Sequence, residues 1–365
     1  MSHFGFIGFG LIGGSIARAL KALQKAPVLT AYQYRPVPSA SLSLALQDKT
    51  LDHITSCLSD LSLCDMIFLC APVQKNLEYL PLLKDIISPD CIITDVGSVK
   101  GSIHKRVAEL QMEHCFIGGH PMTGSEKTGY EHSSALLMEN AYYILTPTDK
   151  TSQSALASYS TLIEQMGSIP VVLDPAEHDR ITAAISHVPH LIAAQLVNLI
   201  RTSGPLEPKM RMLAAGGFKD ITRIASSSPE LWENICLENK QSVCDVLKQY
   251  QTLLSEALTF VEQENQTDLY QLFDDAGTYR NSIPARTSGI LAPVHELFVD
   301  IRDETGTLAS LAVLLSDHGI SIKNIGILHN REFEQGVLRV EFYSEEDKQH
   351  AILMLKKHGY YIYVR

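Results

Sequence analysis

Short apolar segments alternate with segments of helical periodicity through the first half of the chain. The apolar segments expected to form strands are Phe4–Ile7, Val28–Tyr32, Met66–Ala71, Cys91–Asp95, Tyr142–Thr146 and Pro170–Leu173. Such alternation indicates parallel strands joined by crossover helices. The pattern therefore predicts a doubly wound α/β domain over residues 1–173.

The pattern changes in the second half. Ile181–Ile200 and Leu231–Glu262 carry apolar residues at helical spacing and no convincing strand accompanies them, so residues 174–286 are expected to form an all-helical domain. The segment Ser282–Pro293 has the composition of a linker. Beyond it, residues 295–365 follow the order strand, helix, strand, strand, helix, strand, which predicts a small βαββαβ domain.

Composition narrows the class of protein. A hydrophobic content of 45% with 19% charged residues is typical of a soluble globular enzyme, and no apolar run approaches the roughly 18–20 residues of a membrane span. The N-terminus leaves no room for a signal peptide. A formal charge of -11, without a Lys/Arg cluster, argues against nucleic acid as a partner. Seven scattered cysteines without a C-x-x-C pair suit a reducing compartment. We therefore expect a cytoplasmic protein.

A glycine-rich turn follows the first predicted strand and opens a helix. Its sequence is Gly8-Phe9-Gly10-Leu11-Ile12-Gly13. The first glycine permits the tight turn, the second lets the backbone approach a pyrophosphate, and the amides of the helix N-terminus point at its negative charge. In this context the motif predicts a dinucleotide cofactor.

The residues after the second predicted strand bear on which dinucleotide binds. The acidic residue that ordinarily bonds the adenosine ribose is absent, and Gln33 and Arg35 stand in its place. Gln33 can bond a hydroxyl, whereas Arg35 can pair with a 2′-phosphate or lie in solvent. We favour NAD, and NADP stays open.

Two motifs lie beyond the carboxyl ends of strands, where ligands bind in open α/β sheets. Asp95-Val96-Gly97-Ser98-Val99-Lys100 follows the fourth predicted strand, and Gly118-Gly119-His120-Pro121 follows the next short one. A neutral histidine here can accept the proton of a substrate hydroxyl while its carbon gives up a hydride, with Ser98 orienting either partner. The alternatives are structural: His120 caps a turn, and Ser98 is the N-cap of the following helix.

Two further motifs lie in the predicted helical domain. Ser186-His187-Val188-Pro189-His190 places two histidines on one side of a helix, with the proline expected to kink it. The pair has metal-binding spacing but no third ligand nearby, so we predict no metal site. After Gly216-Gly217, Arg223 is a candidate clamp for a carboxylate, or an ion-pair partner of Asp220 one turn earlier. Trp232 is expected in the core.

Six motifs, in this order and spacing, resemble the prephenate dehydrogenase family. They are Gly8-x-Gly10-x-x-Gly13-Gly14-Ser15, Cys70-Ala71-Pro72-Val73, Gly97-Ser98-Val99-Lys100, His120-Pro121-Met122-x-Gly124-Ser125-Glu126-Lys127-x-Gly129, Ser186-His187-x-Pro189-His190 and Gly216-Gly217-Phe218-Lys219-Asp220-x-Thr222-Arg223. The resemblance covers roughly the first 285 residues and implies a Rossmann domain followed by a helical dimerisation domain. Residues 295–365 resemble an ACT domain, most clearly at Val299–Leu308 and Gly319–Ile322.

This resemblance implies oxidative decarboxylation of prephenate to 4-hydroxyphenylpyruvate, in tyrosine synthesis. His120 is expected to polarise the ring hydroxyl, Ser98 to support it, and Arg223 to bind a substrate carboxylate. The other implied substrate positions are His190, His187, Glu126, Ser125, Gly216 and Asp220, with Glu126 at the pocket rim, where family members gate access. Ala71 and Pro72 are implied as cofactor contacts.

The ACT-like tail implies amino-acid sensing across a homodimer, with allosteric feedback inhibition by tyrosine as the natural hypothesis. The alternative is a domain that only stabilises the dimer. Three other functions compete with the main one: an arogenate dehydrogenase, a β-hydroxyacid dehydrogenase, and a non-catalytic amino-acid sensor on a dehydrogenase scaffold. The His120 motif and the tail argue against the second, and the intact glycines with Ser98, His120 and Arg223 argue against the third.

Overall fold

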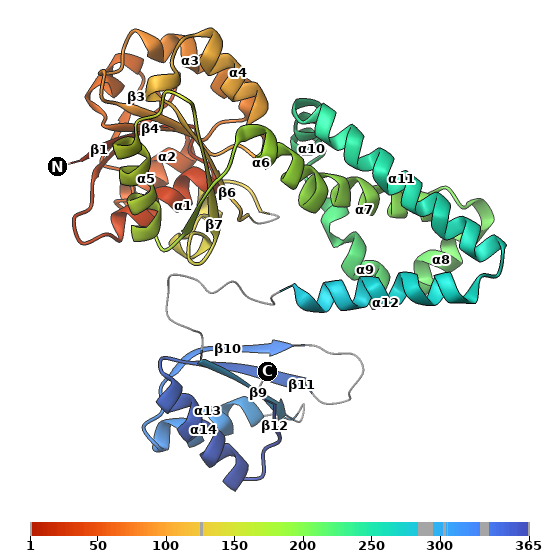
Figure 1. Ribbon diagram of the computed structural model, residues 1–365. Helices are drawn as coiled ribbons and strands as arrows, with labels where there is room; N and C mark the ends of the chain where they lie inside the picture. The colour runs from red at the N-terminus through yellow and green to blue at the C-terminus, as the bar shows by residue number, and fades with distance from the viewer. Residues whose placement is uncertain are drawn as a thin grey trace. The chain divides into compact units, whose positions relative to one another are not determined.

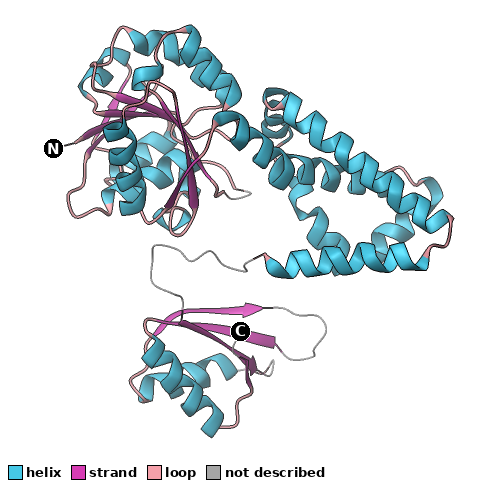
Figure 2. Ribbon diagram, viewed as in Figure 1, coloured by secondary structure: helices cyan, strands magenta, loops and turns pink. Residues whose placement is uncertain are grey.

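A computed structural model describes residues 2–124, 127–283, 295–301, 304, 306–328 and 336–363 (Figure 1). The chain divides into two compact units, Met1–Ile290 and Leu291–Arg365. The first unit holds an α/β domain and a helical domain, and the second a small α/β domain (Figure 2). The fold class expected from the sequence is confirmed.

A five-stranded parallel sheet forms the first layer, in the order β3-β2-β1-β4-β5. Its strands are β1 (His3–Ile7), β2 (Val28–Tyr32), β3 (His53–Thr55), β4 (Met66–Leu69) and β5 (Ile92–Asp95). The connecting segments include α1 (Leu11–Lys21), α2 (Ala40–Gln47), η1 (Leu58–Leu63), α3 (Val73–Lys84) and α4 (Gly101–Glu109). Strand β3 was not predicted, because it has three residues and no fully buried side chain. Two apolar clusters contribute to the core of this domain.

A second sheet of three strands continues the domain. It consists of β6 (Ile117–Pro121), β7 (Tyr142–Pro147) and β8 (Ile169–Val172), and α5 (Gln153–Gln165) precedes β8. Strands β6 and β7 are antiparallel, so the expectation of parallel strands throughout is wrong here. In the described part of the segment between them, residues 122–124 and 127–141, the helical elements are the short turns η3 (Tyr130–His132) and η4 (Ala135–Leu137), and an antiparallel pair needs no crossover helix.

The helical domain begins with one continuous run. This run consists of α6 (Pro175–Thr182), a π-helical turn η5 (Ala183–His187) and α7 (Val188–Arg201). It starts where Asp174 accepts bonds from the amides of Ala176 and Glu177. The later helices are α8 (Glu207–Leu213), α9 (Gly216–Thr222), α10 (Pro229–Glu238), α11 (Lys240–Glu262) and α12 (Gln266–Ser282). The predicted helical domain is confirmed, with a break at Asn239 that the periodicity did not reveal.

The run Pro175–Arg201 carries much exposed apolar surface. By length and composition alone it could cross a membrane, which the sequence pattern did not lead us to expect, and only 22% of its apolar window is buried. An apolar helix of this kind also suits a face that packs on another subunit.

The second unit is a four-stranded antiparallel sheet in the order β10-β11-β9-β12. Its elements are β9 (His295–Ile301), α13 (Thr307–Asp317), β10 (Ile322–Leu328), β11 (Gly336–Phe342), α14 (Glu345–Lys357) and β12 (Ile362–Tyr363). Helices α13 and α14 cover one face of the sheet, where Leu311, Leu315 and Leu355 contribute to the core (Figure 1). The βαββαβ order read from the sequence is confirmed, and most of the predicted linker lies outside the described residues.

Candidate active site

The carboxyl ends of the parallel strands bring the predicted cofactor residues to one edge of the sheet. Gly8 follows β1, Gln33 follows β2, Ala71 and Pro72 follow β4, and Ser98 lies beyond β5. In open α/β folds this edge is where ligands bind. The predicted cofactor residues and Ser98 therefore share one ligand-binding edge of the sheet.

Two glycines of the glycine-rich turn have different roles: Gly8 is required by the backbone, and Gly10 borders open space. Gly8 has a φ of +87°, and a Cβ there would lie 2.4 Å from the backbone nitrogen of Ala71, so only glycine fits. A Cβ on Gly10 would meet nothing within 4 Å. Helix α1 begins at Leu11 with no side-chain cap and no acidic residue in its first turn. Open space before uncapped helix amides suits a pyrophosphate, so this turn fits the dinucleotide predicted from the sequence.

The residues beyond β2 are tied into their own loop. The side-chain amide of Gln33 donates to the carbonyl oxygen of Arg35 at 2.7 Å, and its oxygen accepts from the amide of Ser39 at 3.1 Å. Arg35 is exposed and lies against the ring of Tyr34. Gln33 is thus held in place at the end of β2, where a ribose would bind.

Two histidines from different domains meet at the same edge. His120 lies within β6, paired with Ile144 of β7, and not in the loop that follows. Its Nδ1 lies 2.8 Å from Nε2 of His178 on α6, and Nδ1 of His178 lies 2.8 Å from Oδ1 of Asp179. All three side chains are buried. The structure thus contains a bonded chain from a carboxylate through one imidazole to another.

The Asp179 carboxylate determines which ring nitrogens of His178 and His120 carry a proton. A carboxylate only accepts, so Nδ1 of His178 carries the hydrogen and, in the neutral ring, Nε2 keeps a lone pair. His120 Nδ1 must then donate to that lone pair. Consequently the neutral His120 ring presents an unprotonated Nε2, which is the tautomer that a general base requires.

Asp179 also caps helix α4. Its Oδ1 accepts from the amide of Lys100 at 2.7 Å, and its Oδ2 accepts from the amide of Gly101 at 2.8 Å. The cap residue Lys100 itself makes no side-chain cap bond. The alternative in which Ser98 caps this helix is therefore wrong. Ser98 lies in a bend between β5 and α4, half-buried, and within the described residues no hydrogen bond of its hydroxyl is recorded.

A buried ion pair supports the strand that carries His120. The Lys100 ammonium bonds to Asp95, and it donates to the carbonyl oxygen of Gly119 at 2.7 Å. The amide of Gly119 donates to Asp95 at 3.3 Å. A Cβ on Gly119 would lie 2.6 Å from the carbonyl oxygen of Asp95, so β6 crosses β5 too closely for any other residue. This network fixes the backbone next to His120.

Burial and neighbouring positive charge keep His120 and His187 neutral. Burial lowers the pKa of His120 well below its ordinary value, and His178, Lys100 and His187 add to that shift. Burial likewise lowers the pKa of His187 to about 4. A neutral imidazole at neutral pH is what proton acceptance demands.

The π-helical turn sets the direction of His187. Pro189 has no N–H to offer Ile185, and the amide of Val188 bonds instead to Ala183, five residues back. In an uninterrupted α-helix His187 would lie about 80° around the axis from Asp179, and the extra residue brings the two to within about 20°. Both contact Asn239. The proline that was expected to kink the helix thus accompanies a change of register.

His190 and Trp232 form an aromatic pair beyond the turn. Their rings stack at 3.6 Å with an interplanar angle of 23°, and His187 meets the Trp232 ring edge-on at 6.1 Å. Trp232 is only partly buried, contrary to the expectation of a core residue. Among the described residues, no group of three or more His, Cys, Asp or Glu side chains is arranged to hold a metal ion.

The second helical motif packs on the same helix as His190. Gly216 and Asp220 lie on α9, Arg223 starts η7 (Arg223–Ser226), and both elements contact α7. Arg223 is exposed, and its charge contributes to lowering the pKa of His190, for which burial is the main cause. Ser125 and Glu126 lie outside the described residues.

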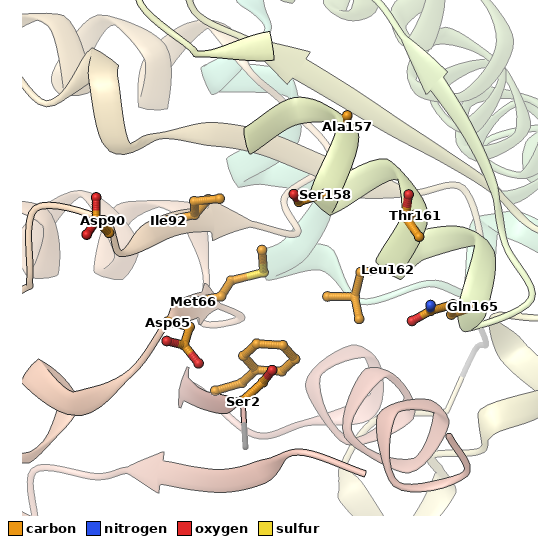
Figure 3. A pocket seen from close by; sticks show the side chains of 11 residues that line it. Ser2, Asp65, Met66, Asp90, Ile92, Ala157, Ser158, Thr161, Leu162 and Gln165 are labelled. Carbon is orange, nitrogen blue, oxygen red and sulfur yellow. The ribbon is translucent and has the colours of Figure 1, made fainter. Parts of the chain in front are cut away.

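One open pocket of about 610 Å³ lies elsewhere, at the amino ends of the parallel strands (Figure 3). Phe4, Met66, Ile92 and Leu162 provide apolar side chains to its lining, and Asp65 and Asp90 provide carboxylates. This is the opposite edge of the sheet from Gly8 and His120, so the pocket is not part of the candidate active site.

Sequence reasoning missed His178, Asp179 and Asn239, and it quoted Asp95 without giving it a role. The available signal was Asp174-Pro175, a strong helix start that places two polar residues, His178 and Asp179, in the first turns of a largely apolar helix. Nothing local showed that they turn toward β6. Lys100 was quoted only as part of a motif.

Comparisons with known proteins identify the family of the chain. The family model of the nucleotide-binding domain of prephenate dehydrogenase matches residues 16–172, and that of its dimerization domain matches residues 174–275. The chain is 37% identical to prephenate dehydrogenase of Bacillus subtilis (strain 168) over 347 residues, 94% of this chain and 93% of that one.

Two solved structures are similar to the first unit. Prephenate dehydrogenase from A. aeolicus, in complex with hydroxyphenyl propionate and NAD+, matches with a TM-score of 0.72 and 31% identity over 78% of this chain and 99% of that one. Synechocystis arogenate dehydrogenase matches with a TM-score of 0.69 and 30% identity over 77% of this chain and 100% of that one. The chain therefore belongs to the prephenate dehydrogenase family.

Proposed function

We propose that the chain catalyses the NAD-dependent oxidative decarboxylation of prephenate. Prephenate and NAD+ give 4-hydroxyphenylpyruvate, carbon dioxide and NADH. The observation that carries this proposal is the bonded chain from Asp179 through His178 to His120, because it leaves Nε2 of His120 as a neutral acceptor at the ligand-binding edge. An acceptor of this kind is what the oxidation of a ring hydroxyl requires.

The residues of the glycine turn fit NAD. Gly8 to Gly13 would hold the pyrophosphate, Gln33 the adenosine ribose, and Ala71 with Pro72 the part that lies over β4. When bound, NAD supplies the acceptor for the hydride that leaves the ring carbon.

His120 manages the hydroxyl proton. Its Nε2 accepts that proton as the ring carbon is oxidised, and His178 with Asp179 stabilises the imidazolium that forms. Loss of the ring carboxylate as carbon dioxide then makes the ring aromatic, and the proton returns to the phenolic oxygen. Ser98, whose hydroxyl makes no hydrogen bond to the part of the chain that the structure describes, lies at the same edge and is proposed to bond the same substrate oxygen.

The helical domain is proposed to hold the rest of the substrate. Arg223 supplies a guanidinium that can pair with a carboxylate in bidentate fashion, and it lies near His190. The stacked pair of His190 and Trp232 gives the pocket a flat wall. Gly216, Asp220, Ser125 and Glu126 remain proposed substrate positions on the strength of the family motif alone.

Absorbance of reduced nicotinamide tests the proposal directly. Purified protein is mixed with prephenate or arogenate and with NAD or NADP. Turnover with prephenate and NAD is expected, and replacing His120 by Asn lowers kcat by roughly 10²–10⁴-fold. His132→Asn, at an exposed position, is the matched control. Silence with both substrates and both cofactors would favour a non-catalytic sensor.

Arogenate is the second candidate substrate. The arogenate dehydrogenase of Synechocystis is similar over the whole of its own length, and the ring chemistry is the same for both substrates. The two differ in the side chain, where arogenate carries an amino group. Comparison of kcat/KM for the two compounds separates these functions.

We also propose a cytoplasmic homodimer that tyrosine inhibits. The exposed apolar surface of Pro175–Arg201, within the segment that matches a dimerization domain, supports a second subunit as its cover. The ACT-like unit supports an amino-acid effector. Removal of residues 291–365, a separate compact unit, is expected to leave turnover and abolish inhibition by tyrosine. Retained inhibition would place tyrosine at the active site.

A further inference from the structure

Asn239 does not cap the helix that follows it. It stands between α10 and α11, where an asparagine ordinarily caps the following helix, yet its side chain makes no bond to the first amides of α11. Instead its amino group donates to the carbonyl oxygen of Asp179 at 2.7 Å and lies 3.2 Å from Nδ1 of His187. With 4% of its surface exposed, Asn239 is committed to the site.

The carbonyl of Asp179 fixes which way the amide of Asn239 points. A carbonyl oxygen only accepts, so the amino group must face it. If the amide were reversed, two oxygens would lie 2.7 Å apart with no hydrogen between them. The second hydrogen of the amino group then meets Nδ1 of His187, which must carry a lone pair. The single proton of the neutral His187 ring therefore lies on Nε2.

The groups around His187 favour that neutral form. The ring is 1% exposed, and burial is the largest influence on its pKa, which falls to about 4. His178 and His190 lower the pKa further, Asp179 opposes them, and the edge of the Trp232 ring completes the surroundings. Hydrogen bonds connect His187 to His120 through Asn239, Asp179 and His178, which places the two rings at one site.

We propose that Asn239 is a positioning residue that fixes His187 as a neutral hydrogen-bond donor to the substrate oxygen at the His120 end of the pocket. The two histidines then carry opposite tautomers: His120 presents an acceptor and His187 a donor. A donor beside the reacting oxygen stabilises the negative charge that develops there as the proton leaves. This assignment of a substrate contact rests on the proposed function.

Nitrogen-15 NMR of the histidine rings in the whole protein tests the tautomer without any substrate. The His187 signals are assigned by their loss in His187→Gln. We expect a proton on Nε2 and an unprotonated Nδ1 at pH 7. A proton on Nδ1 in the wild-type protein would overturn the inference even if the enzyme turns over prephenate, and the measurement stands even if it does not.

Kinetics test the consequence for the reaction. Asn239→Asp keeps the shape but only accepts, so it demands a proton on Nδ1 of His187, and we expect kcat/KM to fall about 100-fold or more and to acquire a new pH dependence. Asn234→Asp, which adds the same charge on α10 but bonds only its own helix, is the control. Equal values for the two variants would overturn the proposal.

Replacement of His187 itself distinguishes a donor from a packing residue. Glutamine carries an amino group near the place of Nε2, whereas leucine carries none. We expect His187→Gln to keep kcat within about 10-fold of the wild type and His187→Leu to lose about 100-fold. Equal losses would contradict a donor at Nε2.

Discussion

Asp179→Asn tests the contribution of the Asp179 charge to catalysis, because the substitution removes the charge and keeps the shape of the side chain. The wild-type carboxylate accepts from His178 and from the amides of Lys100 and Gly101. In the variant, the amide oxygen can keep the bonds to His178 and Lys100, and the amino group then faces the N–H of Gly101. The opposite orientation sets the amino group against two donors and costs more. We therefore expect the geometry of His178 to persist while the negative charge is lost.

The size of the effect follows from the bonded distances. Two bonds of 2.8 Å and the width of one imidazole separate the carboxylate from His120. At roughly 8 Å and an effective dielectric constant of about 20, the attraction for the imidazolium is about 2 kcal/mol, or about 30-fold in rate. The unfavourable contact with Gly101 is expected to lower the free energy of unfolding by about 1–3 kcal/mol.

The assay is kcat by nicotinamide absorbance, with urea unfolding measured on the same samples. Asp174→Asn is the matched control, because the Asp174 side chain caps α6, the helix that carries Asp179, and bonds to two backbone amides rather than to the His178 ring. Asp179→Asn should lose stability and about 30-fold or more in kcat, whereas Asp174→Asn, whose amide oxygen can still accept both capping bonds, should change little in either. Equal kcat values for the two variants would refute the bonded chain as a source of transition-state stabilisation.

Three further predictions follow from glycines and from the partly buried His104. Gly10→Ala should raise the KM for NAD at least 10-fold without loss of stability, because its methyl group would enter open space where the cofactor binds. Gly8→Ala should lower the free energy of unfolding by roughly 1–3 kcal/mol. Equal stability losses in the two variants would contradict these different roles of Gly8 and Gly10. Gly119→Ala should destabilise by a similar amount and displace His120, and Gly124→Ala, with no atom within 4 Å, serves as its control in urea unfolding and kcat. Burial lowers the pKa of His104 to about 4 from the ordinary 6.5. Below pH 6.5 the unfolded chain therefore binds a proton at His104, whereas the folded chain binds it only below about pH 4. The free energy of unfolding consequently decreases as the pH is lowered through this range, by about 2 kcal/mol from pH 7 to pH 5 for this one group. His104→Gln should show a correspondingly smaller fall, and an unchanged pH dependence would be evidence against a neutral buried His104.

The sequence predicted those features that depend on neighbours in the chain. The strands that were predicted, the helical domain, the glycine turn and the βαββαβ tail follow from local periodicity and turn chemistry, and each was found, whereas the short strand β3 and the antiparallel pairing of β6 with β7 were not foreseen. His120 and Ser98 were singled out because the ends of parallel strands meet at one edge. Such reasoning places a residue at an edge without saying what it touches.

The hydrogen-bond partners of His120 could not be predicted from its neighbours in the sequence. His178 is 58 residues from His120 in sequence, and Asp179 caps a helix that begins 78 residues before it. The sequence near Ser98 suggested a local cap, because nothing local shows that the cap comes from another domain. The direction of His187 depends on one wide helical turn, which a period of 3.6 residues does not predict.

The wide turn at Ala183–His187 has a consequence for how such a helix can change. A π-helical turn is what one inserted residue leaves in an α-helix, so deleting one residue there would restore the α-helical register, with Pro189 still leaving one backbone bond unmade. The backbone bonds on either side would persist, but every side chain beyond the turn would rotate by about 100° relative to His178 and Asp179. A single-codon deletion could thus convert this scaffold from a dehydrogenase into a folded protein without its active site, and the reverse insertion could restore it.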